Sequence, residues 1–178
     1  MKDKIINAAF TIVATNGYEN LTMDNLAKMV EVKKGSLYYY FSSKENLIDS
    51  LYTYITTYIK QFTFKISLAQ DAQTILSSCF NFWKQLYFDD LYLYMPLIEQ
   101  RKNIDKRADD INAHINMMIK AQSSAIIENI LSKNNIYNKN VEVLSLMFSS
   151  SAFNILNSDH SEETEDSFLK EFCNVLEN

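Results

Sequence analysis

Apolar residues recur at intervals of three and four positions along almost the whole chain, which is the spacing of one face of an α-helix. In the first segment the pattern runs through Ile5, Ala9, Ile12 and Val13. Applied from end to end, it predicts helices over residues 3–16, 23–29, 34–40, 42–64, 70–88, 89–102, 105–133, 139–157 and 162–177. The helix over 89–102 is expected to break or kink at Pro96, because proline lacks the amide hydrogen and clashes with the preceding turn.

Residues that favour helix ends support these boundaries. Gly17 follows the first helix where a left-handed C-terminal cap is expected. Thr22 is a good N-cap for the second helix. Ser42, with Glu45 three residues later, forms the pattern of a capping box that begins the fourth.

Glycine and proline are rare, because the chain has only Gly17, Gly35 and Pro96 among 178 residues. Sandwiches, barrels and hairpin-rich folds need many more turn residues. The two glycines also stand too far apart for a dinucleotide fingerprint or a P-loop. With 47% apolar and 22% charged residues the chain can fill a core. An all-α fold is therefore predicted.

Cysteine usage and hydropathy indicate the compartment. Cys79 and Cys173 are far apart with no CxxC pair, so neither a disulfide framework nor a structural zinc site is expected. The N-terminus has no secretory apolar run, and no stretch approaches eighteen apolar residues. These features predict a soluble, cytoplasmic protein with no membrane partner.

The net charge gives no general indication of nucleic-acid binding. It is −5 for the chain, while residues 1–50 hold six lysines and six carboxylates and are neutral. DNA binding would therefore have to depend on the local arrangement of charges.

Two short predicted helices joined by a tight turn and braced by a longer helix form a helix-turn-helix. Residues 22–47, TMDNLAKMVEVKKGSLYYYFSSKENL, closely resemble the N-terminal DNA-binding domain of TetR-type transcription regulators. The resemblance covers about residues 4–47. It implies a DNA-binding domain over 1–46 and a helical ligand-binding and dimerisation domain over 47–178.

Nine residues around the second short helix suit DNA contact. Gly35 lets the backbone approach DNA closely. Lys33 and Lys34 flank the helix start, where one is expected to reach a guanine edge and the other a phosphate. Leu37 and Phe41 are expected to be internal braces, and Tyr40 fits either role. The predicted contacts are Thr22, Lys33, Lys34, Gly35, Ser36, Tyr38, Tyr39, Tyr40 and Lys44.

Two positions depart from the family pattern. Glu31 stands where a turn glycine is usual, which predicts a side chain at positive φ beside the DNA face. Lys33 replaces the usual Ser or Thr cap. Together with the neutral charge of residues 1–50, they keep open an alternative: a dimeric ligand-binding or interaction protein whose DNA-reading head no longer works.

The rest of the chain is rich in aromatic residues, which fit either a ligand pocket or an ordinary core. The resemblance implies a small-molecule inducer, here apolar or aromatic. The expected pocket residues are Phe62, Phe80, Trp83, Tyr87, Tyr92, Met95, Met118 and Phe148.

No catalytic or cofactor signature stands out, so neither catalysis nor a cofactor is predicted; a helical enzyme using the aromatic pocket is the remote alternative. Asp110 and His114 have the i, i+4 spacing of metal ligands, but a third ligand is missing, and an exposed helix pair is the simpler interpretation.

The predicted helix over 139–157 is apolar on two sides and therefore needs two partners. Pairing with a second copy would give a four-helix bundle, which is the family's dimer; burial of both sides inside one subunit is the alternative. The expected interface residues are Val143, Met147, Ser150, Phe153, Phe168 and Phe172.

Together these expectations describe a homodimeric, ligand-responsive, sequence-specific DNA-binding regulator in a bacterial cytoplasm. The resemblance implies a repressor that a small molecule releases from a near-palindromic operator.

Overall fold

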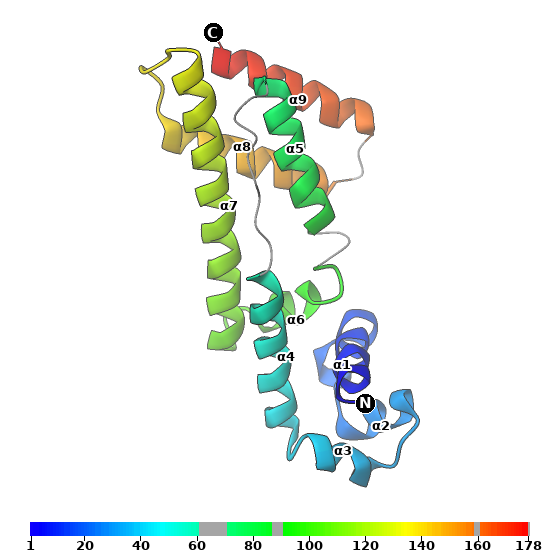
Figure 1. The fold of residues 1–178 in the computed structure, drawn as a ribbon. Helices are drawn as coiled ribbons and strands as arrows, with labels where there is room; N and C mark the ends of the chain where they lie inside the picture. The colour runs from blue at the N-terminus through cyan, green and yellow to red at the C-terminus, as the bar shows by residue number, and fades with distance from the viewer. Residues whose placement is uncertain (61–70, 87–90, 159–160, 178) are drawn as a thin grey trace. The chain divides into compact units, whose positions relative to one another are not determined.

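The computed structural model of the chain describes residues 1–60, 71–86, 91–158 and 161–177, and over these ranges it contains helices and no strand (Figure 1). The predicted all-α fold is confirmed. The elements are α1 (Lys2–Asn16), the 3₁₀ turn η1 (Tyr18–Asn20), α2 (Met23–Val30), α3 (Lys34–Tyr40), α4 (Lys44–Ile59), α5 (Ala72–Gln85), α6 (Met95–Arg101), α7 (Lys106–Lys133), α8 (Val141–Leu156) and α9 (Glu162–Glu177).

The helices form two compact units. The first contains residues 1–63 and 90–114, and the second contains 64–89 and 115–178. Helix α7 contributes its start to the first unit and its remainder to the second.

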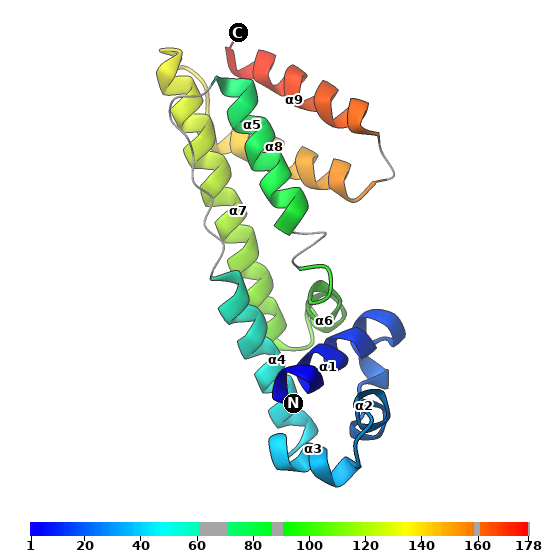
Figure 2. The same ribbon diagram turned by 45° about the vertical axis from the view of Figure 1, so that its right-hand side comes forward.

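In the first unit, α1 packs against α2, α4 and α6, and α2 packs against α3 (Figure 2). The side chains at the centre are fully buried aliphatic and aromatic groups, which fixes the three N-terminal helices around one small core. They include Ile5, Phe10, Leu26, Leu37, Phe41, Leu47 and Leu51.

In the second unit, α5 and α8 both pack against α9. Its core is aromatic. The Trp83 ring lies 5.4 Å from that of Phe148, and Phe148 lies 5.9 Å from Phe168 and 5.1 Å from Phe172. The indole nitrogen of Trp83 donates to the Gln122 amide oxygen at 2.9 Å, which satisfies its polar atom within this apolar cluster.

The capping prediction for Thr22 is confirmed, since its hydroxyl accepts the Asn25 amide at 3.1 Å. The prediction that Ser42 begins α4 is wrong by one residue. Ser43 is the cap, and it accepts the Asn46 amide at 3.0 Å. Phe41 leaves α3 in an extended conformation with its ring buried, which places Ser43 rather than Ser42 at the entry to α4.

The prediction of a helix over 89–102 that breaks or kinks at Pro96 is wrong over residues 91–94, which form turns before the helix begins; residues 89 and 90 lie outside the described residues. Helix α6 begins only at Met95, and Pro96 lies in its first turn. An amide in the first turn of a helix has no intrahelical acceptor, so proline is tolerated there and no kink results.

Four described residues have positive φ angles: Gly17, Glu31, Asn103 and Asn135. Gly17 has φ 85° and ψ 157°, so the expected left-handed cap is not formed although a positive φ is. Glu31 has φ 59° and ψ 45°, which confirms the predicted side chain in the left-handed region between α2 and α3. Across the described residues, no helix is long and apolar enough to cross a membrane.

Candidate DNA-binding interface

Helices α2 and α3 form a helix-turn-helix whose second helix is almost entirely exposed. The turn is closed by the Val32 amide, which donates to the Ala27 carbonyl at 3.0 Å. Of the seven residues in α3, only Leu37 is buried. Leu37 and Phe41 are therefore the internal braces that the sequence predicted. The other α3 side chains are accessible to a partner.

The three consecutive tyrosines extend from this helix into solvent. Tyr39 is 85% exposed, which is unusual for so large a ring, and Tyr38 and Tyr40 are exposed as well. The rings of Tyr39 and Tyr40 meet edge to face at 5.1 Å. Exposed aromatic rings grouped on one short helix mark a binding surface.

Gly35 lies in the first turn of α3, and a Cβ atom added there would meet no atom within 4 Å. Its φ is not in the positive range that favours glycine. No feature of the described chain therefore requires a glycine here. The sequence-based expectation that the Gly35 backbone approaches DNA closely stays a prediction, and the open space around Gly35 leaves room for it.

The predicted cationic contacts differ in their surroundings. Lys33 is exposed and precedes α3 without a side-chain cap. Lys34 forms an ion pair with Asp24 of α2 at 2.8 Å. This hydrogen bond raises the pKa of Lys34 and keeps it charged. Lys44 lies 4.9 Å above the ring of Tyr18.

The two predicted hydroxyl contacts are also exposed. Thr22 uses its oxygen to cap α2, and Ser36 lies in the first turn of α3. Both lie at helix starts, where amides that lack intrahelical acceptors favour phosphate oxygens.

The anchoring of α4 was not foreseen. The Arg107 guanidinium, on the first turn of α7, pairs with Glu45 and Asp105 at 2.8 and 2.7 Å and also with Asp49. It lies 4.8 Å above the ring of Tyr52. The α4 partners are separated from Arg107 by more than fifty residues along the chain, so no local pattern could have indicated them.

Tyr18 is a second unforeseen anchor. The guanidinium of Arg101 lies 4.2 Å above its ring, and its backbone amide donates to Gln100 at 2.7 Å. Burial raises the pKa of Tyr18, so the phenol stays neutral between two cations. The last turn of α6 is thereby attached to Tyr18, the residue that contacts Lys44.

The predicted ligand residues fall into different parts of the fold. Phe80, Trp83 and Phe148 are buried in the aromatic core of the second unit, and Phe80 joins that core through Phe168 at 6.3 Å. Met118 is half-buried on α7. Tyr92 and Met95 belong to the first unit, the former exposed and the latter buried. Phe62 and Tyr87 lie outside the described residues.

The predicted interface residues divide into an exposed and an inward-facing group. On α8, the side chains of Val143 and Met147 are 51% and 49% exposed, and Ser150 is exposed as well. Phe172 is instead buried against Phe148. Phe153 and Phe168 are half-buried within the same subunit.

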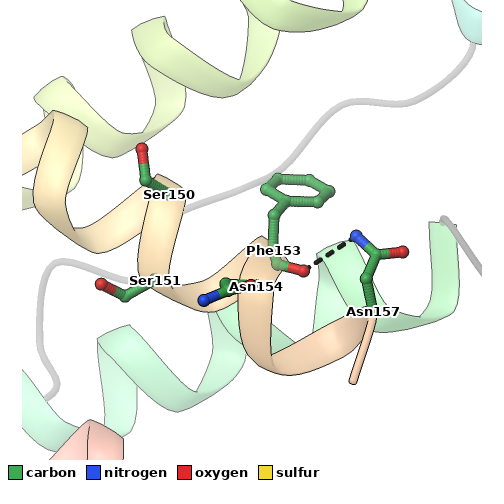
Figure 3. A pocket seen from close by; sticks show the side chains of 5 residues that line it. All are labelled: Ser150, Ser151, Phe153, Asn154 and Asn157. Atoms are coloured by element: carbon green, nitrogen blue, oxygen red, sulfur yellow. Dashed lines mark hydrogen bonds between the residues drawn. The ribbon is translucent and has the colours of Figure 1, made fainter.

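A shallow hollow of about 490 Å³ lies beside the exposed Ser150 of α8. It is lined by Ser150, Ser151, Phe153, Asn154 and Asn157 (Figure 3). At its end the Asn157 amide donates to the Phe153 carbonyl at 2.8 Å. The Phe153 ring also stacks on Trp83 at 5.6 Å. The hollow thus adjoins both the exposed face of α8 and the aromatic core.

Asp110 and His114 are both exposed on α7. No group of three potential metal ligands occurs among the residues that the structure describes.

Comparisons with known proteins identify the N-terminal region. Residues 5–51 match the sequence model of "Bacterial regulatory proteins, tetR family". The biofilm operon icaADBC HTH-type negative transcriptional regulator IcaR of Staphylococcus aureus is 49% identical over 49 residues, which are 28% of this chain and 26% of IcaR. The match thus spans about a quarter of that relative's length.

Solved structures resemble the whole chain. The TetR family regulator PfmR of Thermus thermophilus has a TM-score of 0.68 at 14% identity, over 97% of this chain and 95% of PfmR. AibR, solved with isovaleryl coenzyme A and operator DNA, has a TM-score of 0.65 at 15% identity, over 96% of each chain. At these identities the likeness concerns the fold. The resemblance stated from the sequence is confirmed: residues 5–51 are a TetR-family helix-turn-helix domain, in a chain with the all-α fold of TetR-like regulators.

Proposed function

We propose that the protein is a homodimeric transcriptional repressor that binds a near-palindromic operator and is released from it by a small apolar or aromatic molecule. The observation that carries this proposal is the exposure of α3, with Tyr39 85% exposed and Gly35 open to solvent, on a domain of DNA-binding type. A helix this short and this exposed suits the major groove. The similarity of this domain to the negative regulator IcaR favours repression.

We assign DNA binding and ligand binding to different regions of the chain, which meet at the predicted boundary near residue 46. Residues 1–46 would read DNA, and residues 47–178 would bind the ligand and dimerise. Lys44 begins α4, so the helix that carries a phosphate contact continues into the second of these regions.

The exposed side of α8 supports a dimer. Val143, Leu146 and Met147 are each about half exposed or more, and Ser150 and Ser151 follow on the same helix. Apolar side chains gathered in this way are typical of an interface between subunits. The small serines would let a second α8 approach closely, and the shallow hollow of Figure 3 would be covered. Each dimer would then present two α3 helices to two half-sites.

The aromatic core of the second unit supports an apolar or aromatic ligand. Trp83 and Phe148 are fully buried, and their neighbours Phe153 and Phe168 are half-buried, so a ligand could replace ring contacts with equivalent ones. A ligand favours whichever conformation binds it more tightly. Release of the operator would follow if that conformation separates the two α3 helices by a distance that the half-sites do not match. AibR, of similar fold, has been solved with both an acyl coenzyme A and operator DNA.

The test is a titration of fluorescent duplex by the full chain and two variants. The duplex is obtained by selection from random sequences. Lys33→Ala and Tyr39→Ala should each weaken binding at least tenfold while the dimer remains intact by light scattering. Lys28→Ala, which removes an exposed lysine from α2 rather than α3, is the matched control and should change affinity little.

If both variants bind as tightly as the unmodified chain, α3 is not the reading helix. If selection with the unmodified chain enriches no sequence at all, the helix-turn-helix does not read DNA. The alternative of a dimeric ligand-binding or interaction protein then replaces the proposed repressor.

A further inference from the structure

One ion pair joins α2 and α3, the two helices of the helix-turn-helix, near the predicted DNA contacts. The Lys34 ammonium and the Asp24 carboxylate are 2.8 Å apart, and their side chains are 46% and 63% exposed. Ion pairs this exposed add little to the stability of a fold. A carboxylate beside the phosphate-facing start of α2 also opposes DNA binding, so the pair calls for a different explanation.

The position of Lys34 indicates contact with base edges. It is the first residue of α3, and the N-terminal residues of a recognition helix are those that reach the bases. A lysine ammonium has three hydrogen-bond donors. Asp24 uses one of them, so two remain.

Guanine is the base that matches two remaining donors. In the major groove it presents two acceptors, N7 and O6, whereas adenine presents N7 beside an amino group that is itself a donor. A free lysine side chain has many rotamers and points in no fixed direction. Holding its ammonium against Asp24 removes much of that freedom before DNA arrives.

We propose that Asp24 is a positioning residue that orients Lys34 toward N7 and O6 of one guanine in each half-site. Lys33, exposed beside it, would then take the phosphate. The inference rests on the proposed function, because it requires α3 to enter the major groove. It assigns the two lysines, which sequence reasoning left interchangeable, to different tasks.

Substitution of Asp24 should change general affinity for DNA and preference for sequence in opposite directions. Asp24→Asn removes a negative charge from the DNA face, so binding to random duplex should strengthen. The same change frees Lys34, so discrimination between guanine and adenine should weaken. A pair with a merely structural role would not produce these opposed changes.

The experiment measures binding of the full chain to a selected operator and to duplexes that carry each single base change in one half-site. For the unmodified chain, we expect one guanine whose replacement by adenine weakens binding about 5- to 150-fold. Lys34→Met and Asp24→Asn should each reduce that ratio to about twofold, because neither leaves an oriented pair of donors for N7 and O6. Lys34→Arg should retain it, since arginine also bonds both acceptors.

Matched controls remove the same charges elsewhere. Glu19→Gln removes an exposed carboxylate from η1, and Lys28→Gln removes an exposed lysine from α2. Both should leave the guanine preference intact. Circular dichroism checks that each variant is folded.

If the folded Asp24→Asn variant keeps the full preference for guanine, the inference is overturned, even if its affinity for duplex of random sequence increases. Loss of the preference in the Glu19→Gln control overturns it as well. Absence of any sequence preference in the unmodified chain is a different result, since it contradicts the proposed function itself.

Discussion

The ammonium of Lys44 lies 4.9 Å from the centre of the Tyr18 ring. Lys44 is the first residue of α4, and Tyr18 is the first residue of η1, so the contact joins the elements that precede and follow the helix-turn-helix. Arg101 lies over the same ring at 4.2 Å. Tyr18, which lies between the first two predicted helices, therefore holds Lys44, a predicted DNA contact, in position.

Replacing Tyr18 by leucine should weaken DNA binding about two- to fivefold, because a cation–π contact at an exposed site contributes about 0.5–1 kcal/mol. The dependence of affinity on salt should not change, since Lys44 keeps its charge. Lys44→Gln should instead reduce the slope of log affinity against log salt by about 1. Anisotropy titrations at several salt concentrations measure both effects.

Tyr18→Phe is the control for this prediction, because it keeps the ring and removes only the hydroxyl. Equal losses in Tyr18→Phe and Tyr18→Leu would contradict a role for the ring.

Glu31→Gly should stabilise the protein by about 1 kcal/mol, because the left-handed conformation of this residue is strained for an L side chain and relaxed for glycine. Its backbone angles are φ 59° and ψ 45°. Glu31→Ala removes the same charge but keeps the strain, so it should not stabilise. Denaturation in urea compares the two, and equal stabilisation by both would show that charge rather than backbone strain is responsible.

Arg107→Met should destabilise the protein by about 1–2 kcal/mol at neutral pH, because Asp105 is buried and loses a charged hydrogen-bond donor. The hydrogen bond from Arg107 lowers the pKa of Asp105. A carboxyl whose pKa is lower in the folded state stabilises the fold above its unfolded value of about 3.9. That contribution disappears as the pH falls through the folded pKa.

The difference in unfolding temperature between Arg107→Met and the unmodified chain should therefore be large near neutral pH and shrink below about pH 3.9. Lys120→Met, which breaks the exposed pair between Lys120 and Glu142, is the control and should change the unfolding temperature little at any pH. A difference that stays constant from neutral to strongly acidic pH would rule out this assignment.

Phe148→Ala should destabilise the protein by about 3–5 kcal/mol, because it leaves a cavity in the aromatic core. Phe148 is fully buried and contacts Trp83, Phe168 and Phe172. Tyr137→Ala, at an exposed ring between α7 and α8, should stay within about 0.5 kcal/mol. Chemical denaturation followed by Trp83 fluorescence gives both values. A loss below about 1 kcal/mol for Phe148→Ala would mean that the core is loosely packed.

Met147→Glu should convert the proposed dimer to monomers, because it places a charge in the middle of the exposed apolar side of α8. Sedimentation equilibrium measures the mass, with Met117→Glu as the control at another exposed methionine on α7. A dimer that survives Met147→Glu and dissociates with Met117→Glu would move the interface to α7.

Helix positions were predictable from the sequence because the apolar periodicity is long and regular. The α3 boundaries and the Thr22 cap agree with the structure to the residue. Pro96 was misjudged because the same residue can break a helix or occupy its first turn, and only the position of the helix start decides between them. Ser42 and Ser43 are both competent caps, and tertiary burial of Phe41 made the choice.

Within the candidate site, the exposure of the tyrosines could be anticipated from a motif, whereas the charge partners could not. Asp24 and Lys34 are ten residues apart on different helices, and Arg107 meets Glu45 across the fold. Such contacts depend on the angles between helices, which periodicity does not encode. The exposed side of α8 was predictable because a helix apolar on both sides exceeds what one neighbour can cover.

Selection from random duplexes tests whether α3 reads DNA sequence. The purified full chain is incubated with a random library, and bound duplexes are recovered through several rounds and sequenced. We expect enrichment of a near-palindrome with two half-sites, and loss of that enrichment in Tyr39→Ala. A pool that stays random after selection, although the protein is folded and dimeric, would contradict this expectation.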